Sequence, residues 1–156
     1  NRHSRLHSSC QVIEHNDSLI EYERTGIAID SVISSQLLIN IFEHNTPLHD
    51  GAVLVRGNRI VAATCYLPLS DNRELSKDLG TRHRAAVGIS EVTDSLTVIV
   101  SEETGKVSVA IGGELFRNVD AAELKSKLEL LQNKVYEEKK ILFWKGRARN
   151  EKSSDK

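Results

Sequence analysis

A hairpin of two apolar strands is the feature that most constrains how this chain can fold. Residues 52–56 and 59–66 both carry strand patterns, and Gly57-Asn58 between them suits a two-residue turn. The second strand is apolar along nearly its whole length from Ile60 to Tyr66, which predicts a central strand covered on both faces. The chain carries further strand and helix patterns on both sides of this hairpin.

Three other segments have strand patterns. Residues 96–100 are strongly apolar, as is typical of a buried strand, and residues 106–111 follow after a short polar turn. Gly112-Gly113 is a second hairpin signal. Near the N-terminus, residues 10–14 predict a short strand.

Three segments have helical patterns. Residues 30–42 place apolar side chains on one helical face, and Asp30, Ser31 or Ser34 is expected to cap the start of that helix. Residues 80–92 predict a second helix. Asp120-Ala121-Ala122-Glu123 is a capping-box sequence, and it starts a third helix whose apolar stripe suits core or dimer packing. The stripe consists of Leu124, Leu128, Leu131 and Val135.

Composition indicates a soluble globular protein. The chain has 156 residues, of which 39% are hydrophobic and 28% charged, so it suits one domain and is not disordered. We expect residues 1–9 to be a loose end, residues 10–138 to form the domain, and residues 139–156 to be a basic tail. No apolar run approaches the roughly 20 residues that span a bilayer.

Charge and cysteine content exclude several kinds of site. The net charge of −1 argues against a nucleic-acid partner, so any site for anions must be local. Cys10 and Cys65 have no metal-ligand spacing and give no disulfide framework, which fits a reducing cytosol. We expect Cys65 to be a buried thiol.

A first polar motif, Asn45-Thr46-Pro47-Leu48-His49-Asp50-Gly51-Ala52, separates the first predicted helix from the hairpin. Pro47 cannot extend the helix, and Gly51 lets the backbone take unusual conformations and approach a ligand closely. The motif thus presents the imidazole of His49 and the carboxylate of Asp50 at the edge of the sheet. Taken alone, the same residues are also typical of a plain polar loop.

A second motif, Gly80-Thr81-Arg82-His83-Arg84, opens the second predicted helix. The N-terminus of a helix attracts anions and disfavours cations. Two arginines there make electrostatic sense if an anion is present, and arginine holds phosphate oxygens in a planar fork. We therefore prefer a polyphosphate site to the alternative, a solvated basic turn.

Two more features suit a nucleotide site. The turn Ser101-Glu102-Glu103-Thr104-Gly105 places carboxylates and hydroxyls at a strand end, where they suit a divalent cation or simply form a solvated acidic turn. Tyr66 at the end of the hairpin is either a core aromatic or a surface on which a flat ligand stacks.

Together the two motifs resemble the signatures of the diadenylate cyclase family, which are Asp-Gly-Ala and Arg-His-Arg. Residues 23–27, 37–42, 65–69 and 85–105 resemble the membrane-associated type of that family, and the likeness runs from about residue 13 to residue 116. The chain departs from that type at residues 8–12, which are polar where such relatives begin with a glycine-containing apolar strand.

The resemblance implies an α/β fold with a central mixed β-sheet flanked by helices. It implies that the domain condenses two ATP molecules into cyclic di-AMP with release of two pyrophosphates, using Mg²⁺ or Mn²⁺. Full-length relatives carry N-terminal transmembrane helices, absent here, so the domain is expected at the cytoplasmic face of a bacterial membrane. Regulatory protein partners are expected as in the family.

The resemblance also implies roles for individual residues. The catalytic residues are Asp50, at the attacking 3′-hydroxyl, and Arg82, His83 and Arg84, at the phosphates. The substrate-binding residues are Gly51, Ala52, Tyr66, Leu67, Gly80, Thr81, Ser101 and Glu103. The metal ligands are His49, Asp50 and Glu103. Whether Asp50 accepts the proton of the hydroxyl or only binds metal stays open.

Each domain has one copy of each motif, yet the product requires two ATP molecules. A two-fold homodimer with its sites face to face meets this need. Two other functions fit the same residues: a non-catalytic adenine-nucleotide sensor, and a metal-dependent phosphohydrolase that uses His49 and Asp50.

Overall fold

The structure, a computed structural model, describes residues 8–132 and divides the chain into two units, residues 1–120 and 121–156. In the second unit, residues 121–132 form a helix that begins directly after Asp120, as the capping-box sequence predicts. Val135 and the basic tail at residues 139–156 lie outside the described residues. The predicted domain boundaries stay predictions.

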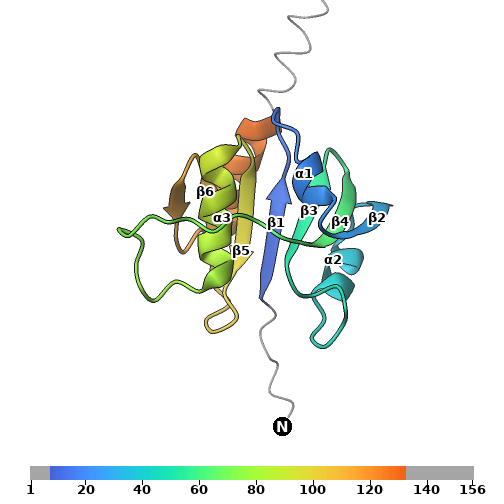
Figure 1. Cartoon of the computed structure of the whole chain (residues 1–156), viewed down its shortest axis with the longest axis horizontal. Helices are drawn as coiled ribbons and strands as arrows, with labels where there is room; N and C mark the ends of the chain where they lie inside the picture. Colours follow the sequence, from blue (N-terminus) through green and yellow to red (C-terminus); the bar gives the residue numbers. More distant parts are fainter. Residues whose placement is uncertain (1–7, 133–156) are drawn as a thin grey trace, which may run out of the picture. The chain divides into compact units, whose positions relative to one another are not determined.

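A seven-stranded sheet forms the centre of the first unit, with the strand order β2-β4-β3-β1-β5-β6-β7 (Figure 1). The strands are β1 (Ser9–Ile13), β2 (Ile27–Val32), β3 (Ala52–Arg56), β4 (Arg59–Cys65), β5 (Leu96–Val100), β6 (Val107–Ile111) and β7 (Glu114–Phe116). Strands β1 and β3 are parallel and the other neighbouring pairs are antiparallel. The mixed sheet confirms the predicted fold class.

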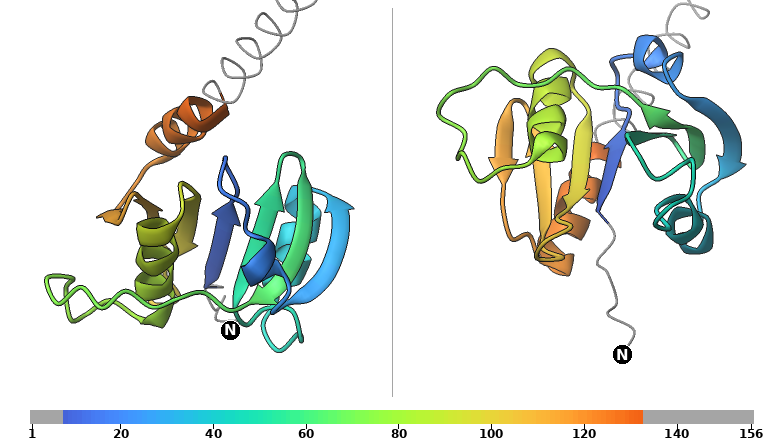
Figure 2. Two further views of the ribbon diagram at one scale, coloured as in Figure 1. Left: turned by 45° about the horizontal axis from the view of Figure 1, so that its top comes forward. Right: turned by 60° about the horizontal axis from the view of Figure 1, so that its bottom comes forward.

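Helices cover both faces of this sheet. Figure 2 shows α1 (Ile20–Glu23) and α3 (Thr81–Val92) on one face and α2 (Ser35–Ile41) on the other. On the first face, Leu19 and Ile89 pack against residues of β1, β3 and β4, while Ile41 and Phe42 pack on the second. Within residues 8–132, no helix is both long enough and apolar enough to cross a membrane.

Strand β1 lies at the middle of the sheet although two of its five residues, Ser9 and Gln11, are polar. It pairs with β3 on one side and with β5 on the other, so its backbone hydrogen-bonding groups are used on both sides. Ser9, Cys10 and Val12 are buried. The polar residues that depart from the family pattern therefore still form the predicted first strand.

The helix predicted over residues 30–42 is wrong at its start, because residues 30–32 belong to the edge strand β2 and α2 begins only at Ser35. Strand β2 pairs with β4, and the guanidinium of Arg59 donates from Nε to Asp30 Oδ1 at 2.9 Å. Asp30 and Ser31 therefore cap nothing. Ser34 is the N-cap of α2, and its hydroxyl accepts a hydrogen bond from the Leu37 amide at 3.2 Å.

The second hairpin strand, β4, is irregular in its pairing and one residue shorter than predicted. Strand β4 lies between β2 and β3, away from the centre of the sheet, and it ends at Cys65. Its burial alternates, with Arg59, Val61 and Thr64 only partly covered. Pairing with β3 is irregular, and Thr64 has a φ of 56°. The apolar run is nevertheless buried on both faces, as predicted. Ala62 and Cys65 lie in the core on the side of α1 and α3, and Ile60 and Ala63 lie in the core on the side of α2.

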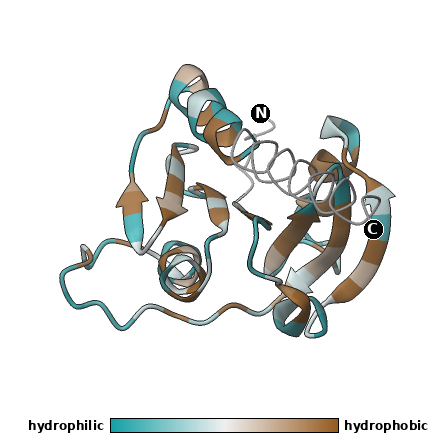
Figure 3. Cartoon of the chain, turned by 90° about the horizontal axis from the view of Figure 1, so that it is seen from above, coloured by the Kyte–Doolittle hydropathy of each residue, from teal (hydrophilic) through white to brown (hydrophobic). Residues whose placement is uncertain are grey.

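A long connection, residues 66–80, crosses α3 on its way from β4. Its outer part is largely hydrophilic, whereas the strands beneath are mostly hydrophobic (Figure 3). Ser70 fixes it to the helix, because its amide donates to the Arg84 carbonyl at 3.0 Å and its hydroxyl to Glu91 Oε1 at 2.5 Å. Gly88 is required at this crossing, since a Cβ there would collide with the Pro68 carbonyl.

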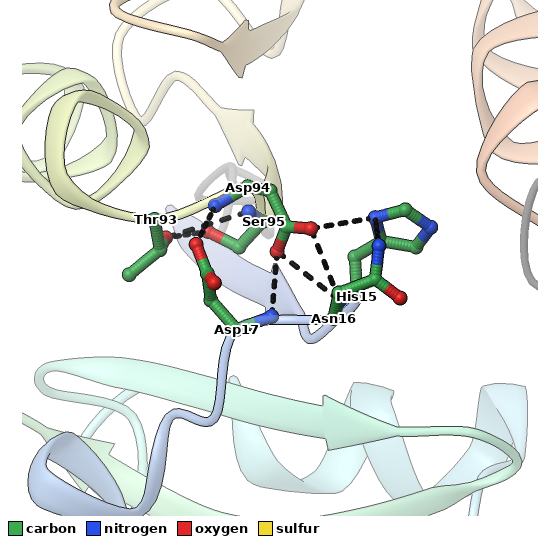
Figure 4. Close-up of polar contacts among 6 residues, drawn as sticks. All are labelled: His15, Asn16, Asp17, Thr93, Asp94 and Ser95. Atoms are coloured by element: carbon green, nitrogen blue, oxygen red, sulfur yellow. Dashed lines mark hydrogen bonds and ion pairs between the residues drawn. The ribbon is translucent and has the colours of Figure 1, made fainter.

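A polar cluster joins the end of β1 to the turn between α3 and β5 (Figure 4). The Asp94 carboxylate accepts hydrogen bonds from the amides of Asn16 and Asp17 and lies 2.8 Å from His15 Nδ1. In return, the Asp94 amide donates to Asp17 Oδ2 at 2.9 Å. Burial raises the pKa of Asp94, but the amides of Asp17 and Asn16 and the His15 ring lower it below its usual value.

Candidate active site

Two neighbouring pockets meet at the start of α3, and both are lined by Thr81 and Arg82. The first, of about 230 Å³, is mainly apolar and includes Gly51, Ala52, Tyr66, Leu67, Leu69 and Ala85. The second, of about 380 Å³, is polar and includes Gly80, His83, Ser101, Glu103, Lys106 and Arg117. An elongated ligand with one apolar end and one anionic end would fit across the shared residues.

The apolar pocket depends on close contact between the first motif and β4. Gly51 has a φ of +90°, and a Cβ there would lie 2.8 Å from the carbonyl carbon of Thr64. No other residue type takes this conformation so readily. Cys10 and Cys65 form part of the pocket wall, and burial raises the pKa of these thiols to about 12 and about 11, so they stay neutral.

Tyr66 stands at the open side of this pocket with 75% of its surface exposed. Its backbone amide donates to the Thr25 hydroxyl at 2.9 Å, which fixes its position at the end of β4. The alternative that Tyr66 is a core aromatic is therefore wrong. An exposed phenol ring beside an apolar pocket is well placed to cover a flat ring system.

The N-terminus of α3 forms one wall of the polar pocket. Gly80 is the N-cap residue in an extended conformation, and no side chain caps the helix. The helix has 12 residues, so the free amides of its first turn carry the full attraction of a helix N-terminus for anions. Thr81, Arg82 and His83 of that turn all line the pocket.

Arg82 lies between two carboxylates. Its Nη2 is 3.8 Å from Asp50 Oδ1, and its Nη1 is 3.9 Å from Glu102 Oε2. Its Nε is buried and has no hydrogen-bond partner among residues 8–132. A buried donor without a partner costs free energy unless a ligand satisfies it, so this guanidinium is set to receive an anion.

His83 is neutral near pH 7 for reasons visible in its surroundings. Burial lowers the pKa of its ring below the usual value, and the positive charge of Arg117 lowers it further. The Asp78 carboxylate partly opposes these effects. His83 therefore offers a hydrogen bond to the polar pocket rather than a full positive charge.

The His49-Asp50 pair of the first motif lies at the rim rather than inside either pocket. Asp50 is 89% exposed at its side chain and, like His49, is absent from the lining of both pockets. His49 Nδ1 lies 2.6 Å from the Thr46 carbonyl oxygen. Because a carbonyl only accepts, Nδ1 carries a proton, and in the neutral ring Nε2 keeps a lone pair that can bind a metal.

The predicted metal ligands do not form one cluster. No group of three or more His, Cys, Asp or Glu side chains that could hold a metal occurs within residues 8–132. Glu103 and its neighbour Glu102 both line the polar pocket, and Glu102 pairs with Arg82. A cation at this site would need ligands from a bound molecule in addition to protein side chains.

Most other predicted site residues lie together. Residues from both motifs and the turn that starts at Ser101 line the two pockets, whereas Arg84 lines neither. The sequence analysis missed the far wall of the polar pocket. That wall includes Asp78, Lys106, Ser108, Arg117 and Asn118. The only signal for them was a cluster of polar residues at strand ends.

Comparisons with known proteins identify relatives of this chain. The chain is 59% identical over 128 residues to a diadenylate cyclase of Listeria monocytogenes serotype 1/2a (strain 10403S), covering 81% of this chain and 47% of that protein. It is 62% identical over 117 residues to the cyclic di-AMP synthase CdaA of Bacillus subtilis (strain 168), covering 75% of this chain and 43% of that protein. The chain thus spans less than half the length of these relatives.

A solved structure shares the fold. A double mutant of DacA from Staphylococcus aureus superposes with a TM-score of 0.79 at 52% sequence identity, covering 81% of this chain and 85% of that one. Residues 2–115 match the DAC family model, described as the nucleotide-binding domain of the DisA bacterial checkpoint controller. The chain therefore belongs to the DAC, or diadenylate cyclase, domain family.

Proposed function

We propose that this chain is the catalytic part of a diadenylate cyclase, which joins two ATP molecules into cyclic di-AMP and releases two pyrophosphates. The observation that carries the proposal is the meeting of an apolar and a polar pocket at Thr81 and Arg82. The apolar pocket suits adenine, and the polar pocket suits a triphosphate. The reacting α-phosphate then lies at the shared residues.

The chain's own side chains supply most of what this reaction needs. Phosphoryl-type transfer depends chiefly on positioning and on stabilising negative charge. Tyr66 and Leu67 would hold adenine, while the amides and side chains of Thr81 and Arg82 would hold the α-phosphate and neutralise its developing charge. Neutral His83, with Ser101, would donate hydrogen bonds to the remaining phosphates.

Asp50 would act on the attacking 3′-hydroxyl. Its carboxylate is almost fully exposed at the rim of the site, so it can reach a nucleotide held outside its own pockets. A carboxylate in that place makes the hydroxyl a better nucleophile by accepting its proton. Two domains that face each other would bring each Asp50 to the reaction between the two ATP molecules.

Mg²⁺ or Mn²⁺ is part of the proposal. The residues fit such an ion only together with phosphate oxygens, because the protein offers scattered ligands: His49 Nε2, the Asp50 carboxylate and Glu103. When bound, the ion would supply charge neutralisation between the phosphates.

The direct test is to incubate the chain with ATP and either Mn²⁺ or Mg²⁺ and to identify the products by mass. Cyclic di-AMP and pyrophosphate are expected. Binding of ATP without any product would indicate a nucleotide sensor. Release of AMP or ADP would indicate a phosphohydrolase. A chain in which Asp50 is replaced by Asn serves as the control for contaminating activity.

The face-to-face homodimer has its own test. Specific activity should fall when the protein is diluted below the dissociation constant of the dimer, because the reacting atoms must come within about 3–3.5 Å. Excess Asp50→Asn chains should also inhibit wild-type chains through mixed dimers. Constant specific activity at dilutions where light scattering detects only monomers would contradict the homodimer.

Location at the cytoplasmic face of a bacterial membrane and regulatory protein partners remain predictions from the family resemblance. Fractionation of cells that express the full-length protein would test the first. Co-purification from those cells would test the second. We expect no binding to nucleic acid.

A further inference from the structure

The proposed function leaves one wall of the polar pocket without a role. That wall carries Lys106 from the end of the acidic turn and Arg117 from the end of β7. Neither residue lines the apolar pocket. Both therefore lie on the side of Arg82 that points away from the adenine end of the site.

Arg117 is placed close to the anion-binding turn of α3. It lines the same polar pocket as His83 of the first turn of the helix, and its positive charge lowers the pKa of the His83 ring. A triphosphate that starts at Arg82 and follows this turn would bring its last phosphate toward Arg117. Arginine is well suited to such a group, since its fork matches two phosphate oxygens.

Arg117 forms an ion pair with Asp78. Its Nη2 lies 3.2 Å from Asp78 Oδ2, and the two side chains are 50% and 59% exposed. Exposed ion pairs of this kind contribute little to stability, so a better anion can displace the carboxylate. Asp78 also lines the polar pocket, in the space that a phosphate group would use.

We propose that Arg117 binds the terminal phosphate of ATP and makes the site select nucleoside triphosphates over diphosphates and monophosphates. Asp78 holds the guanidinium in place until the phosphate replaces it. This inference rests on the proposed function, because it takes the polar pocket to be the triphosphate site.

The test measures binding of 3′-deoxy-ATP, 3′-deoxy-ADP and 3′-deoxy-AMP, which lack the attacking hydroxyl and are not consumed. Arg117→Ala should weaken binding of 3′-deoxy-ATP by about tenfold to a hundredfold and leave 3′-deoxy-AMP within about twofold. Arg117→Lys should fall between wild type and the alanine variant. Asp78→Asn should tighten 3′-deoxy-ATP binding, since it removes the competing carboxylate.

Arg59→Ala is the matched control, because Arg59 is an exposed arginine paired with an aspartate at the far edge of the sheet. It should bind all three nucleotides as wild type does. An Arg117→Ala variant that loses triphosphate and monophosphate binding equally, or loses neither, would overturn the inference. If Arg117→Ala melts early, the lysine and Asp78→Asn variants decide the same question.

The two proposals fail in different ways. If wild type makes no cyclic di-AMP from ATP, the proposed function is wrong. The ratio of 3′-deoxy-ATP binding to 3′-deoxy-AMP binding still tests whether Arg117 binds the terminal phosphate. If wild type makes cyclic di-AMP but Arg117→Ala keeps its preference for the triphosphate, only the role of Arg117 is wrong.

Discussion

Nη2 of Arg82 lies 3.8 Å from Oδ1 of Asp50, so the cation of the second motif and the carboxylate of the first are neighbours at the rim of one site. The spacing is too long for a strong hydrogen bond, and Asp50 remains 89% exposed. Both groups are therefore free to act on a nucleotide rather than on each other.

Replacing Asp50 by Asn should lower turnover by about 10²–10⁴, the usual effect of losing a positioned general base. The melting temperature should not change, because the side chain is exposed and its one ion pair is long. Steady-state kinetics and a thermal scan measure both effects. Asp30→Asn, at an exposed aspartate on the sheet edge, is the control. Near wild-type turnover in a folded Asp50→Asn protein would remove Asp50 from the mechanism.

Arg82→Lys should lower kcat/KM roughly tenfold or more even though it keeps the charge, because lysine lacks the planar fork that grips phosphate. Arg84→Lys should have a smaller effect, since Arg84 lines neither pocket. Kinetics of both variants with ATP distinguish the two arginines. Equal losses would mean that Arg84 also contacts phosphate, as the sequence motif alone predicts.

Tyr66→Ala should weaken ATP binding by about 1–3 kcal/mol, the range for stacking of a base on an aromatic side chain. It should leave the melting temperature unchanged, because the ring is 75% exposed. Tyr22→Ala should instead lower the melting temperature and leave ATP binding unchanged, since Tyr22 is partly buried against the core. Calorimetric titration and thermal scans of the two variants test this contrast. A lower melting temperature for Tyr66→Ala would point to a structural role.

The two cysteines should resist alkylation in the native protein. Burial raises the pKa of Cys10 to about 12 and of Cys65 to about 11, from an ordinary value of 9.0, so few thiolates form near pH 8. In denaturant both thiols should be alkylated, and mass spectrometry can count the alkyl groups added. The thiols hold protons that the unfolded chain releases, so stability should fall as pH rises from about 9 toward 11. Rapid labelling of native protein would contradict this.

Asp94→Ala should destabilise the protein by roughly 1.5–3 kcal/mol, because two backbone amides and His15 lose a charged acceptor. The folded pKa of Asp94 is depressed, so its contribution is present above the unfolded value of 3.8 and is lost as the pH falls below it. Urea unfolding at neutral and acidic pH measures both the destabilisation by Asp94→Ala and its dependence on pH. Asp71→Ala, at an exposed aspartate of the connection between β4 and α3, should change stability by less than about 0.5 kcal/mol. Equal stability of the two variants would contradict the cluster's role.

Local patterns predicted the parts of the fold whose burial repeats regularly. The hairpin of β3 and β4, the apolar strand β5 and the helix α3 follow directly from periodicity and glycine turns. The edge strand β2 was not predicted, because its partly exposed residues also fit one face of a helix. Only its pairing with β4 decides between a strand and a helix. Tertiary contacts override local preference in such segments.

Some residues of the candidate site could likewise be predicted from the sequence and others could not. Short motifs revealed the residues that approach one another at the start of α3, since their chemistry is unusual for a helix N-terminus. Sequence could not reveal Arg117, because its role depends on β7 returning beside β6 to reach the pocket. Nor could it reveal that Tyr66 is exposed, which follows from β4 ending at Cys65.

The position of β1 has a consequence for how the chain assembles. Its two neighbours, β3 and β5, belong to separate halves of the sheet, each formed by strands close together in sequence. Since β1 is synthesised before either half, its pairing with β5 must wait until residues 96–100 exist, and such distant pairing is slow. A chain that starts after Ile13 would leave two half-sheets with open inner edges, and such edges promote aggregation rather than a smaller working domain.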